Sequence, residues 1–271
     1  MSSASSVFLI ALLLAGGPER IAAHPSLPLR VCADPNNLPF SNDGREGFEN
    51  RIAEIVARDL GRPLEYFWMP QRRGFIRNTL KADRCDLVMG VPATSDALQP
   101  TRPYYRSTYV FVSRRDRALR VTSFDDPRLG TLVIGVQVTG DDYANPPAAQ
   151  ALASRGIVSN VRGFTVYGDY SRPNPASGLI DAVARGDVDV AVAWGPLAGY
   201  FAAREPVPLE IAPVLPDADG GLVRFAFDIA MGVRRGDATL AAAVDRVIAR
   251  RRAEIRRVLR EYGVPLVERA S

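Results

Sequence analysis

Histidine and lysine are nearly absent from this chain of 271 residues, which contains one of each, His24 and Lys81. A serine or cysteine nucleophile needs a neighbouring base, and the single histidine lies close to the N-terminus, so neither a Ser-His-Asp nor a Cys-His arrangement fits the sequence. A zinc site lacks ligands for the same reason. The composition therefore predicts a protein without nucleophilic catalysis, without a metal centre and without a cofactor of its own.

The positive charge comes almost entirely from arginine. The formal net charge is +4 and the sequence pI is about 9.3. A nucleic-acid site would need arginines gathered on one surface with aromatic residues between them, whereas here they are spread from Arg30 to Arg269 among the acids. Binding of nucleic acid is therefore not expected.

Long hydrophobic runs are also missing, apart from Val7 to Ala15, which is too short to span a bilayer. This run has the length of a signal-peptide core, and small residues follow at Ala22 and Ala23. We therefore predict a signal peptide over residues 1–23 and a location in the periplasm, although the segment before the run lacks basic residues. The alternative is a soluble N-terminal helix.

Two cysteines, Cys32 and Cys85, remain after the predicted cleavage site. An even number in an oxidising compartment permits one disulfide, provided that the two strand-like segments carrying them are neighbours in register. The sequence favours the bridge, and two buried free thiols are the alternative.

The rest of the chain alternates between strand and helix patterns, which predicts an α/β fold of parallel strands with helices on both faces. The first unit has predicted strands at 29–33, 64–68 and 86–91 and helices at 48–60 and 75–80, with Gly61 as a C-terminal cap. The second unit has predicted strands at 131–136, 165–167 and 188–193 and helices at 148–155 and 178–185. Extended stretches at 104–113 and 225–233 and one long helix from Asp237 to about Tyr262 complete the prediction.

The order of these elements and several motifs resemble the type II periplasmic binding proteins. The motifs are GFENRIAEIVARDLG (47–61), RCDLVMGV (84–91), PYY (103–105), TLVIGVQ (131–137), GDVDVAVAWGPLAGY (186–200) and MGVRRGD (231–237). The resemblance implies two doubly wound α/β lobes joined by two hinge strands, with a ligand cleft between them. The implied boundaries are 28–112 plus 225–265 for lobe 1 and 113–224 for lobe 2.

A narrower resemblance links the chain to the quinoprotein-dehydrogenase-associated binding proteins, the MoxJ or XoxJ type that accompany periplasmic methanol dehydrogenases. It is carried by VCADPNNLPFSN (31–42), MPQRRGFIRNTL (69–80), RPYYRSTYVFV (102–112), GDDYANPP (140–147), VYGDY (166–170) and WGPLAGYFA (194–202). This resemblance implies an accessory role for a methanol dehydrogenase that contains pyrroloquinoline quinone (PQQ), of the calcium or the lanthanide type. The implied partners are that dehydrogenase and, secondarily, its cytochrome c.

Ligand-binding residues in open α/β sheets lie in the loops after the carboxyl ends of the strands. This rule selects residues that combine flat apolar faces with a few polar groups, as small-molecule pockets do. In the first lobe they are Asp34, Asn36, Asn37, Phe40, Trp68, Gln71, Arg72, Val91, Thr94 and Tyr105; in the second they are Gln137, Asp141, Asp142, Tyr143 and Trp194. For Asp141 and Asp142, capping of the following helix is an equal alternative.

An amino-acid ligand is not expected in this cleft. Amino-acid-binding relatives bind the ligand carboxylate with an arginine after the third strand of the first lobe, where this chain reads VPATSDALQPT. They hold the ligand ammonium with an acid at the position occupied here by Trp194. Both charge-assisted contacts are therefore missing. The indole can instead stack on a flat ligand, fill the gap, or anchor a protein partner.

Three functions stay open from the sequence. The first is an accessory protein of a quinoprotein dehydrogenase, and the second is a solute-binding protein that delivers a small ligand other than an amino acid to an ABC transporter. The third is an enzyme acting through carboxylates such as Asp34, Asp141 and Asp142. The resemblance favours the first.

Overall fold

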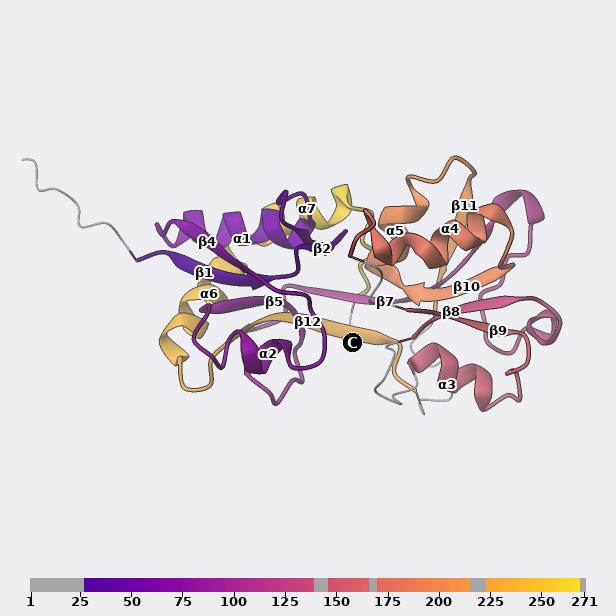
Figure 1. Cartoon of the computed structure of the whole chain (residues 1–271), viewed down its shortest axis with the longest axis horizontal. Coiled ribbons are helices and arrows are strands. Elements are labelled where there is room, and N and C mark those ends of the chain that lie inside the picture. Colours follow the sequence, from indigo (N-terminus) through magenta and orange to yellow (C-terminus); the bar gives the residue numbers. More distant parts are fainter. Residues whose placement is uncertain (1–26, 139–145, 166–169, 215–222, 269–271) are drawn as a thin grey trace, which may run out of the picture.

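The computed structural model describes residues 27–138, 146–165, 170–214 and 223–268, and the predicted signal peptide lies outside them. These residues form two α/β lobes that lie side by side (Figure 1). Eight strands form a continuous path through both lobes in the order β4-β1-β5-β12-β7-β10-β8-β9. The predicted α/β architecture with two successive units is therefore confirmed.

The sheet of the first lobe is parallel where helices connect its strands. β1 lies between β4 and β5 and is parallel to both, with Leu29 opposite Leu64 and Val31 opposite Leu87. β12 arrives from the far end of the chain and is antiparallel to β5. The strands are β1 (Leu29–Ala33), β4 (Leu64–Trp68), β5 (Leu87–Pro92) and β12 (Ala226–Val233).

Helices cover both faces of this sheet, and Figure 1 shows α1 and α7 above the strands and α2 below them. α1 packs because Phe48, Ile52 and Val56 recur at helical spacing on one face and are fully buried. The core they form also contains apolar side chains of α6 and α7. The helices are α1 (Phe48–Asp59), α2 (Phe75–Asn78), α6 (Ala238–Arg250) and α7 (Arg252–Glu261).

The second lobe repeats the plan, with α4 and α5 above the strands and α3 below them in Figure 1. β8 is parallel to β10 and β9, while β7 is antiparallel to β10 and to β11. The strands are β7 (Tyr105–Arg114), β8 (Ile134–Val138), β9 (Val161–Thr165), β10 (Val190–Trp194) and β11 (Leu209–Pro213). The helices are α3 (Pro147–Ala153), α4 (Gly178–Arg185) and α5 (Gly195–Ala202).

β7 and β12 connect the lobes and run through the middle of Figure 1. They pair antiparallel, with Ala226 opposite Thr108. The C-terminal segment lies along β7, since Ser107 Oγ donates a hydrogen bond of 2.6 Å to the carbonyl of Pro265 and Val267 N donates to the carbonyl of Arg106. The predicted lobe boundaries, after residues 112 and 224, fall inside β7 and just before β12, and they stay a prediction.

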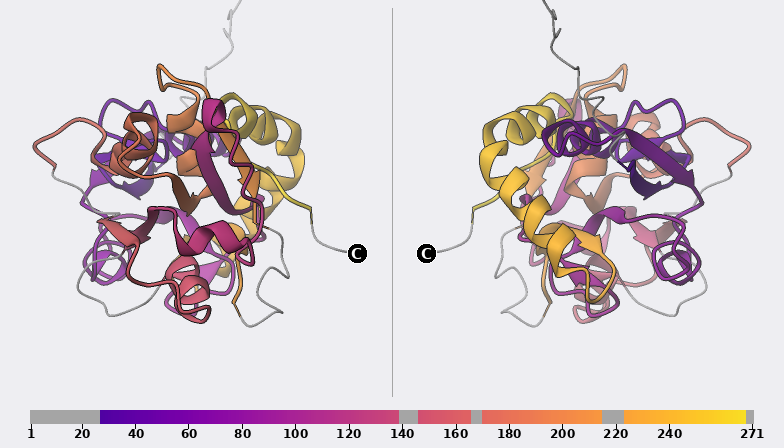
Figure 2. Two further views of the ribbon diagram at one scale, coloured as in Figure 1. Left: turned by 90° about the vertical axis from the view of Figure 1, so that its right-hand side faces the viewer. Right: turned by 90° about the vertical axis from the view of Figure 1, so that its left-hand side faces the viewer.

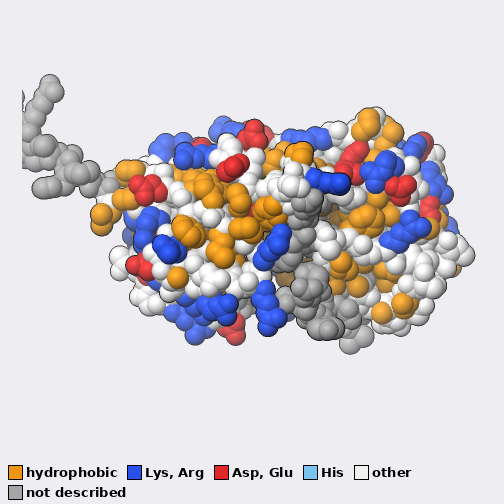
Figure 3. Space-filling view, in the orientation of Figure 1, with side chains coloured by type: hydrophobic (Ala, Val, Ile, Leu, Met, Phe, Trp, Pro, Cys, Tyr) orange, Lys and Arg blue, Asp and Glu red, His pale blue; other side chains and the backbone are white. Residues whose placement is uncertain are grey.

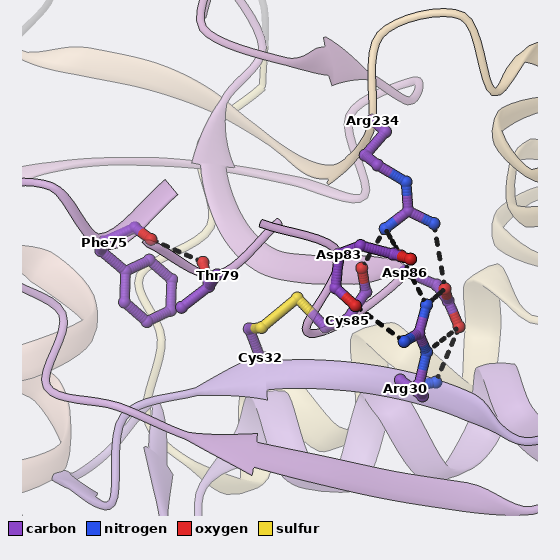
Figure 4. Close-up of a disulfide and its surroundings, with 8 residues drawn as sticks. All are labelled: Arg30, Cys32, Phe75, Thr79, Asp83, Cys85, Asp86 and Arg234. Atoms are coloured by element: carbon purple, nitrogen blue, oxygen red, sulfur yellow. Dashed lines mark hydrogen bonds and ion pairs between the residues drawn. A yellow bond between two sulfur atoms is a disulfide. The ribbon is translucent and has the colours of Figure 1, made fainter. Parts of the chain in front are cut away.

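The predicted disulfide between Cys32 and Cys85 is confirmed, with Cα atoms 5.5 Å apart (Figure 4). Cys32 lies in β1 and Cys85 precedes β5, and these neighbouring strands are in register. Both sulfurs belong to a buried apolar cluster that includes Phe75 and Leu80. The bridge therefore joins two central strands of the first lobe within its core.

Asp86 lies next to the bridge and accepts hydrogen bonds from Arg30 at 2.6 Å and from Arg234 at 3.1 Å. Burial alone would raise the pKa of this carboxyl, but the bonds from Arg30 and Arg234 outweigh it and keep the pKa below its usual value. The carboxylate thus links β1, the start of β5 and the loop after β12.

The prediction of one helix from Asp237 to Tyr262 is wrong, because the helix breaks at Arg251. Arg250 and Arg251 both bind the carboxylate of Asp59 at the end of α1, which fixes the chain at the break. The bend lets α6 pack on β12 while α7 packs along α1. A straight helix would follow only one of these two surfaces.

Several other boundaries differ from the prediction by a few residues. The helix expected at 75–80 ends at Asn78, since Thr79 Oγ1 donates to the carbonyl of Phe75 and leaves helical geometry. The strand expected from Thr131 starts at Ile134. The left-handed cap at Gly61 is confirmed, with a φ of 65°. Helix α5 and strand β11 were not predicted.

Candidate functional site

Asp34 follows directly after β1, and its side chain organises the loops around it. Its carboxylate accepts hydrogen bonds from the backbone amides of Asn36, at 2.9 Å, and Gln71, at 2.6 Å. The residue is only 1% exposed. Because a buried carboxylate needs donors to replace water, these amides hold the loops after β1 and β4 together at the carboxyl ends of the two strands.

The same carboxylate also reaches the second lobe, where the hydroxyl of Tyr170 donates a hydrogen bond to it. Two further contacts lie beside this one. Asn36 Nδ2 donates to the carbonyl of Arg172 at 2.9 Å, and the guanidinium of Arg72 lies 4.9 Å from the centre of the Tyr170 ring. The segment around Tyr170 therefore joins the two lobes across the cleft.

These contacts engage polar groups that the sequence predicts for ligand binding. Burial raises the pKa of Tyr170, and its hydrogen bond to Asp34 raises it further, so the hydroxyl stays protonated and donates to the carboxylate. A ligand that enters between the loops has to displace Tyr170 from Asp34. The structure is thus a closed arrangement held by the protein's own side chains.

Trp194 and Gln137 meet at the second lobe's side of the cleft. The buried Gln137 accepts a hydrogen bond of 2.7 Å from the backbone amide of Trp194 through Oε1. The indole packs edge-on against Tyr109 at 5.5 Å and Phe227 at 5.9 Å between ring centres. Trp194 therefore belongs to an aromatic cluster where β7, β10 and β12 come together, and its half-buried ring fills the space between the lobes.

A second contact between the lobes lies where α5 meets the end of α7. The rings of Tyr200 and Tyr262 stack with 5.7 Å between their centres. Beside them, a Cβ atom on Gly199 would lie 2.0 Å from the carbonyl oxygen of Gly263, so only glycine permits this approach. The lobes are therefore in contact around Tyr262 as well as around Tyr170.

Glu49 is a buried carboxyl group on the core-facing side of α1. Burial raises its pKa to about 8, with a second contribution from the nearby charge of Asp34. Gly90 makes room for it, because a Cβ there would lie 2.1 Å from Glu49 Oε1. Burial raises the pKa values of Tyr104 and Tyr105, and the charge of the nearby Glu49 raises them further. At neutral pH, Glu49 therefore carries a proton inside the first lobe.

The other predicted site residues differ in their burial and in the elements that carry them. Asn37 is in a short hairpin, β2 (Asn36–Asn37) with β3 (Ser41–Asn42), and Phe40 packs against the cores of both lobes. Trp68 stacks on Tyr66 at the edge of the sheet, at 4.5 Å. Thr94 is exposed, and Tyr105 is buried in the first core. Asp141, Asp142 and Tyr143 lie outside the described residues.

The structure adds contributors that the sequence did not single out, namely Glu49, Tyr109, Tyr170 and Phe227. Glu49 had a signal, since an acid on the apolar stripe of a predicted helix is unusual. For Tyr170, the only signal in the sequence was its place in the motif VYGDY. Within the described ranges, no cluster of three or more histidine, cysteine, aspartate or glutamate residues is arranged to hold a metal, and no helix has the length and apolarity needed to cross a membrane.

Replacing Tyr170 with phenylalanine is expected to weaken the closed arrangement by about 2 kcal/mol, since a hydrogen bond to a charged group is lost. The open population should rise by a factor of roughly 30. Hydrogen exchange at the amides of Asn36 and Gln71, together with the radius of gyration from small-angle scattering, measures the effect. Tyr109→Phe is the control, because no described residue bonds its hydroxyl. Equal exchange in wild type and Tyr170→Phe would contradict the prediction.

The sequence and the fold of this chain are similar to those of binding proteins of one family. The sequence profile of bacterial extracellular solute-binding proteins, family 3, matches residues 29–264. Protein MoxJ of Methylorubrum extorquens is 32% identical over 88% of this chain and 81% of its own length. Protein MoxJ of Paracoccus denitrificans is 29% identical over 93% and 95%. The crystal structure of periplasmic binding protein XoxJ from Methylobacterium extorquens AM1 is 35% identical, covering 89% of this chain and all of that one, with a TM-score of 0.73.

Proposed function

Since the chain belongs to family 3 of the bacterial extracellular solute-binding proteins, we propose that it is a periplasmic accessory protein without catalysis of its own. Its proposed partner is a methanol dehydrogenase that contains PQQ, whose maturation or activation it supports. The cytochrome c of that dehydrogenase is a second proposed partner. PQQ and its metal belong to the dehydrogenase in this proposal, and the chain itself holds neither.

The self-closed cleft is the observation that carries this proposal. Asp34, Asn36 and Gln137 are predicted ligand residues, and each one contacts the protein itself. A transporter-linked binding protein needs such groups for its solute. The similarity to MoxJ and XoxJ over nearly the whole described chain supports the accessory role. A binding-protein scaffold whose cleft is closed by its own side chains suits recognition of a protein better than capture of a solute.

Co-purification with the dehydrogenase tests this proposal. The tagged protein is mixed with a periplasmic extract that contains the dehydrogenase, and the activity of that enzyme is then assayed with and without the protein, with calcium and with a lanthanide. We expect a stable complex and a several-fold higher activity with one of the two metals. The control is another family 3 binding protein that carries the same tag. Absence of a complex together with unchanged activity would overturn the proposal.

Solute capture for an ABC transporter is the second candidate, and the family match favours it. The aromatic cluster of Trp194, Tyr109 and Phe227 suits a flat ligand without the charges of an amino acid. Such a ligand would raise the melting temperature by mass action. A thermal-shift screen of flat, uncharged metabolites, repeated with Trp194→Ala, distinguishes this candidate from the accessory role.

A further inference from the structure

A groove of about 680 Å³ lies outside the cleft, between α6, α7, the start of β7 and the C-terminal segment. Apolar side chains of Ile248, Ile255 and Leu266 line it, together with the guanidinium groups of Arg102, Arg106, Arg252 and Arg256. Figure 2 shows α6 and α7 in yellow along one side of the molecule. We call this surface the arginine groove.

Two further hollows extend the groove, because they share residues with it. One of about 550 Å³ shares Arg252 and Arg256 and adds Arg260, also on α7. The other, of about 410 Å³, shares Arg106 and Asp228 and adds Arg224. Arginines therefore line all three hollows, with Arg252, Arg256 and Arg260 on α7 and Arg106 and Arg224 near β12.

Two acids, Asp228 and Glu268, line the arginine groove together with its four arginines. Arg106 pairs with Asp228 at 3.2 Å. In the part of the chain that the structure describes, the side chains of Arg102, Arg224, Arg252, Arg256 and Arg260 form no ion pair. Some arginines elsewhere contact acids, as Arg58 and Arg114 do. On the face shown in Figure 3, blue and red side chains lie next to one another over the second lobe.

The row on α7 is unfavourable for the folded protein by itself. Arg252, Arg256 and Arg260 are four residues apart, which places like charges on one line of the helix. Each such pair destabilises a helix by a few tenths of a kcal/mol. Arginines outnumber acids in the groove, and this excess of positive charge beside the partly exposed Leu266 and Val267 attracts an anion that also carries apolar groups.

We propose that the arginine groove is a docking surface for an extended, acidic segment of a partner protein. The inference rests on the proposed accessory function and names the part of the protein that meets the partner. The segment carries carboxylates at every second residue and small or aliphatic side chains between them. Its carboxylates pair with the arginine row, and its apolar side chains contact Ala249, Leu266 and Val267.

The spacing of the row supports an extended segment. Successive arginines on α7 are about 6 Å apart along the helix axis, from a rise of about 1.5 Å per residue. Alternate residues of an extended chain are about 6.8 Å apart. Consecutive carboxylates of an acid-x-acid-x-acid pattern therefore fit consecutive arginines. Planar guanidinium groups bind carboxylates with two parallel hydrogen bonds, which makes arginine well suited to this role.

Binding of a synthetic peptide of alternating glutamate and alanine, eight residues long and fluorescently labelled, tests the docking surface at low salt by anisotropy. We expect Arg252→Glu/Arg256→Glu to lower the affinity at least tenfold. The control Lys81→Glu/Arg115→Glu makes the same change in charge at exposed positions outside the groove and should stay within twofold of wild type. A second variant, Arg252→Gln/Arg256→Gln, removes the charges without reversing them and should also lose affinity. Its circular dichroism spectrum shows whether the variant is folded.

Two results would overturn the proposal. One is an equal loss in both charge-reversed variants, which would mean attraction by net charge alone. The other is tighter binding of a single-stranded oligonucleotide or of anionic vesicles with the same dependence on Arg252 and Arg256. The dehydrogenase pull-down separates this inference from the proposed function. If the dehydrogenase binds wild type and Arg252→Glu/Arg256→Glu equally, the groove proposal fails while the accessory function stands. If it binds neither but the peptide is bound, the accessory function fails.

Discussion

Loss of the disulfide between Cys32 and Cys85 is expected to lower the free energy of unfolding by about 4 kcal/mol. The bond closes a loop of 53 residues, and the chain-entropy relation for a loop of that length gives this value. The melting temperature should fall by roughly 10 °C for a domain of this size. The effect is large because the loop that the bond closes is long.

Reduction and mutation together distinguish the contribution of the covalent bond to stability from that of the buried side chains. Cys32→Ala/Cys85→Ala removes the bond and some buried volume, whereas reductant acting on wild type removes the bond alone. We expect reductant to lower the melting temperature of wild type most of the way to that of the variant and to leave the variant unchanged. Two free thiols in unfolded, unreduced protein would contradict the bridge itself.

The free energy of unfolding is also expected to fall as the pH rises from about 4.5 to about 8. In the folded protein burial keeps Glu49 protonated up to about pH 8, whereas the unfolded chain releases this proton near 4.5. Between these values the folded state holds the extra proton, so stability falls by about 1.4 kcal/mol per pH unit. The contribution is fully present below pH 4.5 and is lost above pH 8.

Glu49→Gln removes this titration with little change in shape. Denaturant unfolding at pH 5, 6, 7 and 8 should give a flatter profile for the variant, which becomes the more stable protein toward pH 8. Glu54→Gln, on the exposed face of the same helix, is the matched control and should follow wild type. Parallel profiles for wild type and Glu49→Gln would show that the carboxyl is ionised or solvated in the folded protein.

Local sequence patterns predicted the first lobe well, where apolar runs and caps agree with tertiary packing. Strands 29–33 and 64–68 match the structure at both ends. Helix α5 was not predicted because it contains two glycines and a proline, which disfavour helix. Its stability comes from burial of nearly every residue and from the close approach of Gly199 to Gly263. The break at Arg251 depends on Asp59, nearly two hundred residues away, and has no local signal.

The site was predictable one lobe at a time. The rule on strand ends selected Asp34, Gln137 and Trp194, and all three lie at the carboxyl ends of their strands. What the rule could not supply was how they are paired. Tyr170 lies 136 residues from Asp34, and Trp194 lies 57 residues from Gln137, so these contacts depend on the arrangement of the strands and lobes.

Helix α7 belongs to two surfaces at once. One of its faces carries the arginine row, and its end meets the second lobe through Tyr262 and Gly263. An occupant of the groove that shifts this helix must also change the energy of separating the lobes. Thermodynamic reciprocity then requires the state of the cleft to alter the affinity of the groove by the same factor. A partner in the arginine groove would therefore bind with a different affinity when the cleft is open and when it is closed.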